Sequence, residues 1–221
     1  MCGLRSRNML KAFALFLSVP LFGLGCGDFD ADGSDKSGSL FNLEYIDPTY
    51  FEESTRQVDV ALGNCADLDE DPDPEPFSDH FADVTLSNRP LNNSLETPPT
   101  IYLDEYWVWY EPLTLGSPSL PNITVTGIRD HAGIDPCDPG GQCSGETLSQ
   151  IKFVEVQQKG VLYDYLYAPG GTCDPLTGVG ICQLEYNIYY RFFGTNDYGY
   201  EVSADGSTNF YATNYDNCGG G

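Results

Sequence analysis

The aromatic segment at residues 106–110 (YWVWY) is the strongest candidate for binding chemistry in this sequence. Side chains of a β-strand point alternately to its two faces. One face would carry Tyr106, Val108 and Tyr110, and the other would carry Trp107 and Trp109. If the first face is buried, the two tryptophans form an outward platform of the kind that stacks on sugars or grips a partner protein. The alternative is that a loop, or an insertion at residues 129–147, covers them.

A second aromatic row occupies alternate positions at Tyr163, Tyr165 and Tyr167. On a strand these three side chains share one face. We expect the row either to extend the tryptophan platform or to pack across it.

Catalytic signals are weak. The two histidines, His80 and His131, each follow an aspartate in polar sequence, and we expect both at the surface. The sequence has no Gly-x-Ser-x-Gly elbow for a nucleophilic serine. The 33 acidic residues neither support nor exclude a carboxylate pair at glycosidase spacing. We therefore expect no catalytic residue and no cofactor.

Two acidic segments are weak candidates for calcium, which prefers oxygen ligands. The first begins like an EF-hand loop, but Ser39 stands where that loop needs a bidentate glutamate. The second lies in a loop that a disulfide could rigidify. The candidate ligands are Asp28, Asp30 and Asp32 in the first segment, and Asp130, Asp135 and Asp138 in the second. We interpret both as solvated loop charge and expect no metal.

The cysteines indicate disulfides in an oxidising compartment. Cys137 and Cys143 enclose a Gly/Pro-rich turn, and Cys173 and Cys182 enclose a predicted hairpin tip. Both pairs favour local clips, which would leave Cys65 and Cys218 to join the early strands to the end of the chain. Six cysteines allow other connectivities as well. Zinc is the weaker alternative, because the sequence lacks Cys-x-x-Cys.

The N-terminus has the form of a signal peptide at residues 1–25, with the true start at Met1 or Met9. Its apolar run is shorter than the roughly 20 residues that span a bilayer as a helix. Cys26 lies where bacterial lipoproteins carry their lipid, and lipidation leaves an even number of cysteines after the signal peptide is removed. The alternative is ordinary cleavage before Cys26. Since Gly27 and not aspartate follows, we expect an outer-membrane lipoprotein.

The net charge of −23 argues against nucleic acid as a partner, because phosphate binding needs a basic surface. Residues 26–39 are polar and Gly/Ser/Asp-rich and predict a flexible acidic tether after the lipidated cysteine. Residues 40–221 then form a single domain. A charge of this sign also disfavours direct docking on an anionic membrane.

The mature chain is rich in short β-patterned segments bounded by Gly, Pro and Asn. Such strands without βαβ alternation predict an antiparallel β-sandwich, with a closed barrel as the alternative. Residues 147–158 are the best short helix candidate. The predicted strands cover residues 57–62, 81–87, 100–111, 122–127, 151–157, 161–167, 184–193 and 209–213.

Residues 76–216 resemble uncharacterised immunoglobulin-like β-sandwich lipoproteins of Gram-negative bacteria of the deltaproteobacterial type. The matching segments are residues 81–90, the apolar positions Leu103, Tyr106, Val108 and Tyr110, residues 192–199, residues 201–203, Phe210, and residues 215–216. The resemblance implies an all-β, antiparallel immunoglobulin-like β-sandwich that ends in a hairpin and a closing strand. The resemblance implies no chemical activity for this chain. In that hairpin we expect Gly194 and Gly199 to bracket the turn, where only Gly or Asn adopts a positive φ cheaply.

The sequence therefore predicts a non-catalytic cell-envelope lipoprotein that acts as a binding or assembly module. Its expected partners are the membrane, through the lipid on Cys26, and an envelope protein or glycan. One alternative is a carbohydrate-binding module that uses Trp107 and Trp109. The other is a secreted hydrolase.

Overall fold

The computed structural model describes residues 39–50, 53–60, 77–90, 97–128, 133–137, 143, 145–174 and 178–213. Within these ranges the secondary structure is β-strand, apart from the helix α1 (Val156–Leu166) and short irregular segments. The predicted all-β fold is confirmed. The described residues include no helix long and apolar enough to cross a membrane.

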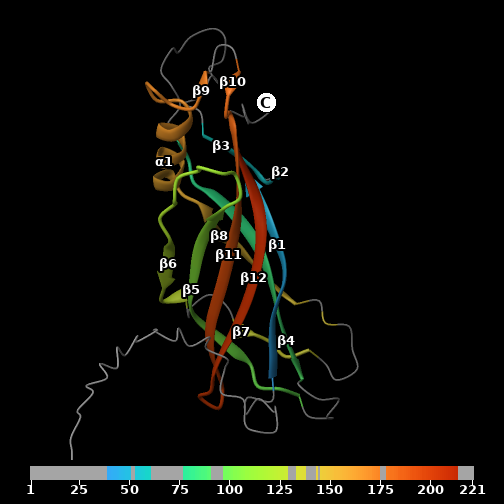
Figure 1. Ribbon diagram of the computed structural model, residues 1–221. Helices are drawn as coiled ribbons and strands as arrows, with labels where there is room; N and C mark the ends of the chain where they lie inside the picture. Colours follow the sequence, from blue (N-terminus) through green and yellow to red (C-terminus); the bar gives the residue numbers. More distant parts are fainter. Residues whose placement is uncertain are drawn as a thin grey trace, which may run out of the picture.

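The strands form two main sheets (Figure 1). The smaller sheet is antiparallel and has the order β2–β1–β4–β8. Its strands are β1 (Ser39–Tyr50), β2 (Glu53–Ser54), β4 (His80–Pro90) and β8 (Glu146–Val154). β1 begins at the end of the molecule opposite α1 and runs towards it, as Figure 1 shows.

The larger sheet has the order β3–β12–β11–β5–β6, with β7 paired to the start of β5. Only the short β3 runs parallel to its neighbour among these pairs. Its strands are β3 (Gln57–Asp59), β5 (Ile101–Pro112), β6 (Ile123–Thr126), β7 (Gly133–Ile134), β11 (Gln183–Asn196) and β12 (Glu201–Thr213). A separate small hairpin pairs β9 (Cys173–Asp174) with β10 (Val179–Gly180).

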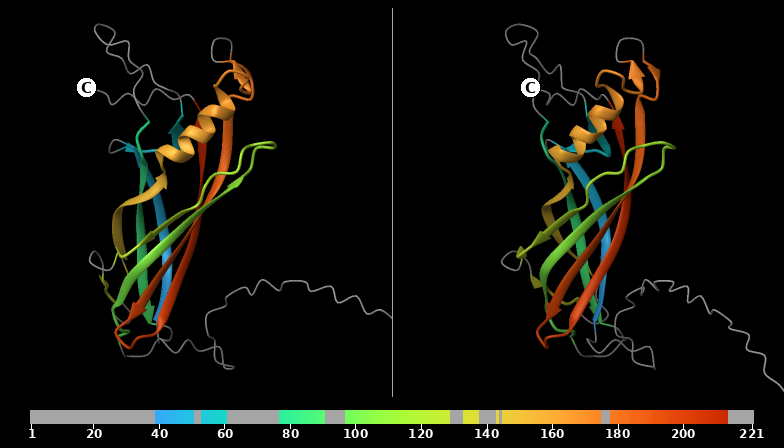
Figure 2. Two further views of the ribbon diagram at one scale, coloured as in Figure 1. Left: turned by 90° about the vertical axis from the view of Figure 1, so that its left-hand side faces the viewer. Right: turned by 60° about the vertical axis from the view of Figure 1, so that its left-hand side comes forward.

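The two sheets face each other across one hydrophobic core, and α1 lies across one end of them (Figure 2). The inward residues alternate with outward ones along the long strands, as in β11, where every second side chain is buried. The largest fully buried side chains include Tyr186, Tyr190, Phe192 and Phe210 of the larger sheet, and Leu86 and Phe153 of the smaller. The two main sheets are hydrogen-bonded separately, so the described strands do not close into the barrel considered as the alternative.

Tyrosine hydroxyls link the sheets through the core. Tyr110 donates to the Phe153 carbonyl at 2.7 Å, and Tyr190 donates to the Lys152 carbonyl at 3.0 Å. The Tyr106 hydroxyl accepts from the Lys152 amide at 3.1 Å. Burial raises the pKa of Tyr110 and of Tyr190 well above the usual value, so both hydroxyls stay protonated. Because an unpaired buried polar group is costly, these bonds fix β8 opposite β5 and β11.

The helix α1 corrects the predicted strand at residues 161–167 and the last residues of the one predicted at 151–157. The helix candidate at residues 147–158 was also wrong, because most of it lies in β8. The buried helical face contains Gln158 and Lys159 beside Leu162 and Leu166, so hydrophobicity alone does not reveal it. The tyrosines at alternate positions mimicked a strand instead.

The start of α1 is capped by a residue far away in the sequence. The Val156 amide donates to Asp79 Oδ1 at 3.0 Å, while Glu155 at the helix N-cap makes no side-chain cap. The sequence next to the helix therefore lacks the usual start signal. The predicted tyrosine row also does not exist, because residues two apart on a helix, such as Tyr163 and Tyr165, do not share a face.

The hairpin of β11 and β12 differs from its prediction at one glycine. Gly199 has the expected positive φ of +83°, and Asn196 Oδ1 accepts from the amides of Tyr198 and Tyr200. Gly194, however, lies inside β11 at a register shift with β5. A Cβ there would lie 2.7 Å from the Tyr102 carbonyl oxygen. Close approach of β5, and not the turn, is what requires this glycine.

We predict opposite effects of alanine at two glycines. Gly160 lies inside α1 with no atom within 4 Å of an added Cβ, so Gly160→Ala should raise the free energy of unfolding by about 0.5–1 kcal/mol. Gly194→Ala should lower it, because its Cβ meets backbone. Urea denaturation of both variants provides the test. Destabilisation by Gly160→Ala would contradict the helix.

Candidate binding face on the larger sheet

Burial along β5 follows the predicted alternation. Tyr106, Val108 and Tyr110 are buried in the core, with 3%, 0% and 9% of their surface exposed. On the opposite face Trp107 is 42% exposed and Trp109 is half-buried. The described part of the insertion at residues 129–147 includes β7, which pairs with Ile101 and Tyr102 at the start of β5 and not beside the tryptophans.

Each tryptophan has an aromatic neighbour on β11. Trp109 is opposite Tyr189, and their rings are nearly parallel, 10° apart in plane with centroids 5.4 Å apart. Trp107 packs on Phe193 with ring centroids 4.8 Å apart. We call Trp107, Trp109, Tyr189 and Phe193 together the aromatic face. Tyr189 and Phe193 were not among the predicted site residues, although alternation within the predicted strand at 184–193 places both on the outer face.

Two charged side chains, Glu111 and Arg191, flank the aromatic face, and each is bonded to a neighbouring side chain. The Tyr189 hydroxyl donates to Glu111 Oε2 at 2.6 Å, and this bond raises the pKa of Tyr189. Arg191 lies between Tyr189 and Phe193 on β11 and makes a bidentate pair with Asp205, with N–O distances of 2.6 and 2.9 Å. The guanidinium is thereby held in place and its charge is balanced.

A shallow groove of about 290 Å³ opens beside the tryptophans. Its lining combines two indoles, apolar strand residues and polar groups: Trp107, Val108, Trp109, Asn122, Ile123, Thr124 and Arg191. The pairing of β6 with β5 runs from Glu105 to Val108 and stops short of Trp109. Since β6 begins opposite Val108, it does not pair with Trp109, and the groove borders the Trp109 indole there.

The loop between β5 and β6 is tied down at two points. Tyr186 donates to the Pro118 carbonyl at 2.8 Å, and Gln158 Nε2 of α1 donates to the Pro121 carbonyl at 2.9 Å. Leu120 between them is buried. These contacts fix the chain directly before Asn122 and so hold one wall of the groove.

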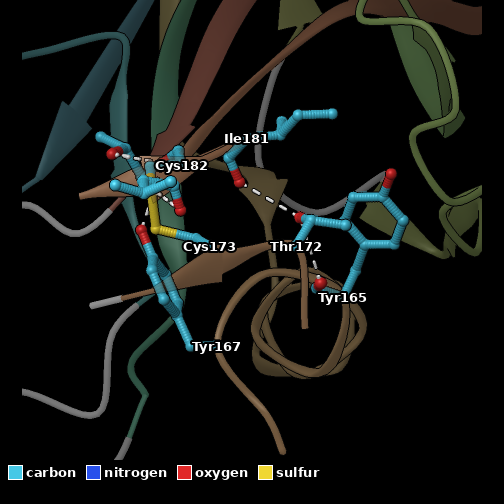
Figure 3. Close-up of a disulfide and its surroundings, with 8 residues drawn as sticks. Tyr165, Tyr167, Thr172, Cys173, Ile181 and Cys182 are labelled. Atoms are coloured by element: carbon cyan, nitrogen blue, oxygen red, sulfur yellow. Dashed lines mark hydrogen bonds between the residues drawn. A yellow bond between two sulfur atoms is a disulfide. The ribbon is translucent and has the colours of Figure 1, made fainter. Parts of the chain in front are cut away.

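The disulfides Cys137–Cys143 and Cys173–Cys182 confirm the two predicted local clips. Figure 3 shows the second, where Tyr167 donates to the Cys182 carbonyl at 3.2 Å and the Thr172 hydroxyl lies near the carbonyls of Tyr165 and Ile181. The disulfide closes the β9–β10 hairpin on itself, and the hydrogen bonds of Tyr167 and Thr172 connect that hairpin to the end of α1. Cys26, Cys65 and Cys218 lie outside the described residues.

Of the predicted calcium ligands, only Asp135 lies within the described residues. It is exposed, and its Oδ1 lies 3.4 Å from the Thr100 hydroxyl. Asp28, Asp30, Asp32, Asp130 and Asp138 lie outside the described residues. The described part of the chain holds no cluster of three or more metal-ligating side chains.

His80 corrects the expectation of a surface histidine. It is the first residue of β4, is fully buried, and packs on Phe153 with ring centroids 5.1 Å apart. Burial, reinforced by the nearby Lys159, lowers the pKa of His80 to about 3, against a backbone hydrogen bond with Thr55 that raises it. Burial also lowers the pKa of Lys159 to about 8. His131 lies outside the described residues.

The comparisons with known proteins add no relative. No protein-family model, no curated protein and no solved structure matches the chain. The chemistry of the aromatic face is therefore inferred from its own geometry.

The buried His80 predicts acid sensitivity. Because its folded pKa of about 3 lies below the unfolded value of 6.5, the unfolded chain binds more protons between these pH values. Stability should therefore fall as the pH drops below about 6.5, by roughly 2 kcal/mol at pH 5 relative to pH 7.

Urea denaturation at pH 7 and pH 5 measures this effect, since both pH values lie above the ordinary pKa values of carboxyl groups. Both proteins compared should carry His131→Gln, so that His80 is the remaining histidine. His80→Phe should remove most of the pH dependence. If the free energy of unfolding falls equally from pH 7 to pH 5 with and without His80, the burial of His80 does not control acid stability.

Proposed function

We propose that this chain is a non-catalytic binding or assembly module of the cell envelope, and that the aromatic face is its binding surface. The observation that carries the proposal is the grouping of Trp107, Trp109, Tyr189 and Phe193 on the outer face of a rigid sheet, beside a groove with polar walls. Exposed aromatic groups with a polar border are typical of binding sites. Buried hydrogen bonds to β8 support the same strand from behind.

The proposed location rests on the N-terminal sequence. Residues 1–25 act as the signal peptide, and Cys26 carries the lipid that anchors the chain at the outer membrane. The pairing of four of the remaining cysteines in two disulfides supports an oxidising compartment. The high negative charge fits a lipid anchor better than direct docking on anionic lipid.

We also propose that the sandwich is immunoglobulin-like. In that fold the first, second and fifth strands share one sheet, and the third, sixth and seventh share the other. Here β1, β4 and β8 lie in the smaller sheet, and β5, β11 and β12 lie in the larger, which fits this division. The helix between β8 and β11 departs from the usual pattern.

A carbohydrate-binding module is the more specific form of this proposal, and the groove beside Trp109 favours it. The hydrolase alternative gains no support from His80, because a fully buried ring does not contact a substrate in solution.

Lipidation predicts a simple change in distribution. The wild-type chain should fractionate with membranes and incorporate labelled palmitate, whereas Cys26→Ser should do neither, because it lacks the thiol that carries the lipid. Cell fractionation and autoradiography measure both. Cys65→Ser is a matched control, which should keep the label. Membrane-bound, palmitate-labelled Cys26→Ser would contradict the anchor.

The binding surface predicts where cross-links form. A photoreactive phenylalanine analogue at Trp107 should form adducts in intact cells, because this side chain would lie in the interface. The same analogue at Leu40, which is similarly exposed at 45% on the smaller sheet, is the matched control. Electrophoresis detects the adducts. Equal yields at both positions, or adducts at Leu40 alone, would contradict a binding role for the aromatic face.

A further inference from the structure

We propose that the groove beside Trp109 binds one neutral pyranose ring of a glycan chain. The inference rests on the proposed binding role of the aromatic face and adds the class of ligand. It also assigns binding roles to Asn122, Thr124 and Arg191, which line the groove with the two tryptophans.

The arrangement of the aromatic rings leaves one side of the Trp109 indole for stacking. Tyr189 covers one side of the Trp109 indole, since the two rings are nearly parallel and adjacent across the strands. The groove borders Trp109 as well, at the position that β6 does not reach. The electron-rich face of an indole attracts the slightly positive C–H groups on the flat side of a sugar ring.

The polar walls suit hydroxyl groups. Asn122 offers an amide donor and acceptor, Thr124 offers a hydroxyl, and Arg191 has five N–H donors, of which two positions bind Asp205. A sugar ring presents hydroxyls around its edge that can bond to all of these groups. A purely apolar side chain of a partner protein would leave them without partners, at a cost.

The size of the groove indicates a single ring. Its volume of about 290 Å³ lies at the lower end of the ligand pockets of proteins, which measure roughly 300–1,000 Å³. The groove is open to solvent, so neighbouring rings of a chain can extend beyond it.

The charges around the groove select a neutral ligand. Arg191 is the cation of its lining, and Asp205 balances that charge through the bidentate pair. Glu111 lies next to Tyr189, and the whole chain carries a net charge of −23. An anionic sugar would meet this field without a free cation, so it should bind more weakly than a neutral one.

The test is calorimetric titration of the full chain, matured in its host and purified in a detergent without sugar groups. The probes are neutral oligomers of glucose and of N-acetylglucosamine, and oligogalacturonate as the acidic probe. We expect saturable binding of a neutral oligomer, and at least tenfold weaker binding of oligogalacturonate. Trp109→Ala should weaken neutral binding at least tenfold, and Asn122→Ala about threefold to tenfold.

Two further variants make the result specific. Tyr198→Ala removes an aromatic side chain that is 71% exposed at the far hairpin turn, and it should leave affinity unchanged. Asp205→Asn releases the charge of Arg191 and should strengthen oligogalacturonate binding at least threefold. Thermal melting of each variant confirms that it is folded. If Trp109→Ala or Asn122→Ala does not fold, Thr124→Val, which keeps the strand, takes its place and should likewise weaken the binding of neutral oligomers.

Three outcomes would overturn the inference: no binding of any neutral oligomer, tighter binding of oligogalacturonate by the wild type, or equal effects of Trp109→Ala and Tyr198→Ala. Cross-linking at Trp107 separates this failure from failure of the proposed function. Adducts with a protein and no glycan binding would reject the glycan and keep the binding face. Absence of both would reject both.

Discussion

Tyr106, Tyr110 and Tyr190 reach across the core and form hydrogen bonds with the backbone of β8. Two of these tyrosines belong to β5, and their inward position determines where every other side chain of that strand points. A slip of one residue would bury the two tryptophans and expose the tyrosines, with loss of the bonds to β8. The same register of β5 therefore determines both the contact between the sheets and the outward position of Trp107 and Trp109.

The outer face of the larger sheet depends on that constraint in turn. Since β11 pairs with β5 in a fixed register, Tyr189 lies opposite Trp109, and Arg191 lies opposite Trp107. The short β6 then sets the extent of the groove, and the tied loop before it holds Asn122. A rigid surface of this kind loses little conformational entropy when it binds a ligand. These properties fit the proposed role of a non-catalytic binding module.

Strand alternation made much of this predictable from the sequence. It gave the all-β fold and the inward face of β5, and cysteine spacing gave two disulfides. The features that could not be predicted from the sequence depend on contacts between residues far apart in the chain. Asp79 caps α1 from far along the chain, and the close approach of Tyr102 explains Gly194. Likewise, Tyr189 and Arg191 become site residues only once the register of β11 on β5 is known.

The two tryptophans face outward from a strand whose Tyr106 and Tyr110 are buried. Tryptophan emission with acrylamide quenching tests this arrangement most directly, because Trp107 and Trp109 are the two tryptophans of the chain. Acrylamide is uncharged, so the negative field of the protein does not exclude it. We predict red-shifted emission that acrylamide quenches efficiently. The two indoles should become fully exposed to the quencher only on unfolding. Blue-shifted emission protected from acrylamide would contradict the outward position of the tryptophans and the binding face built on it.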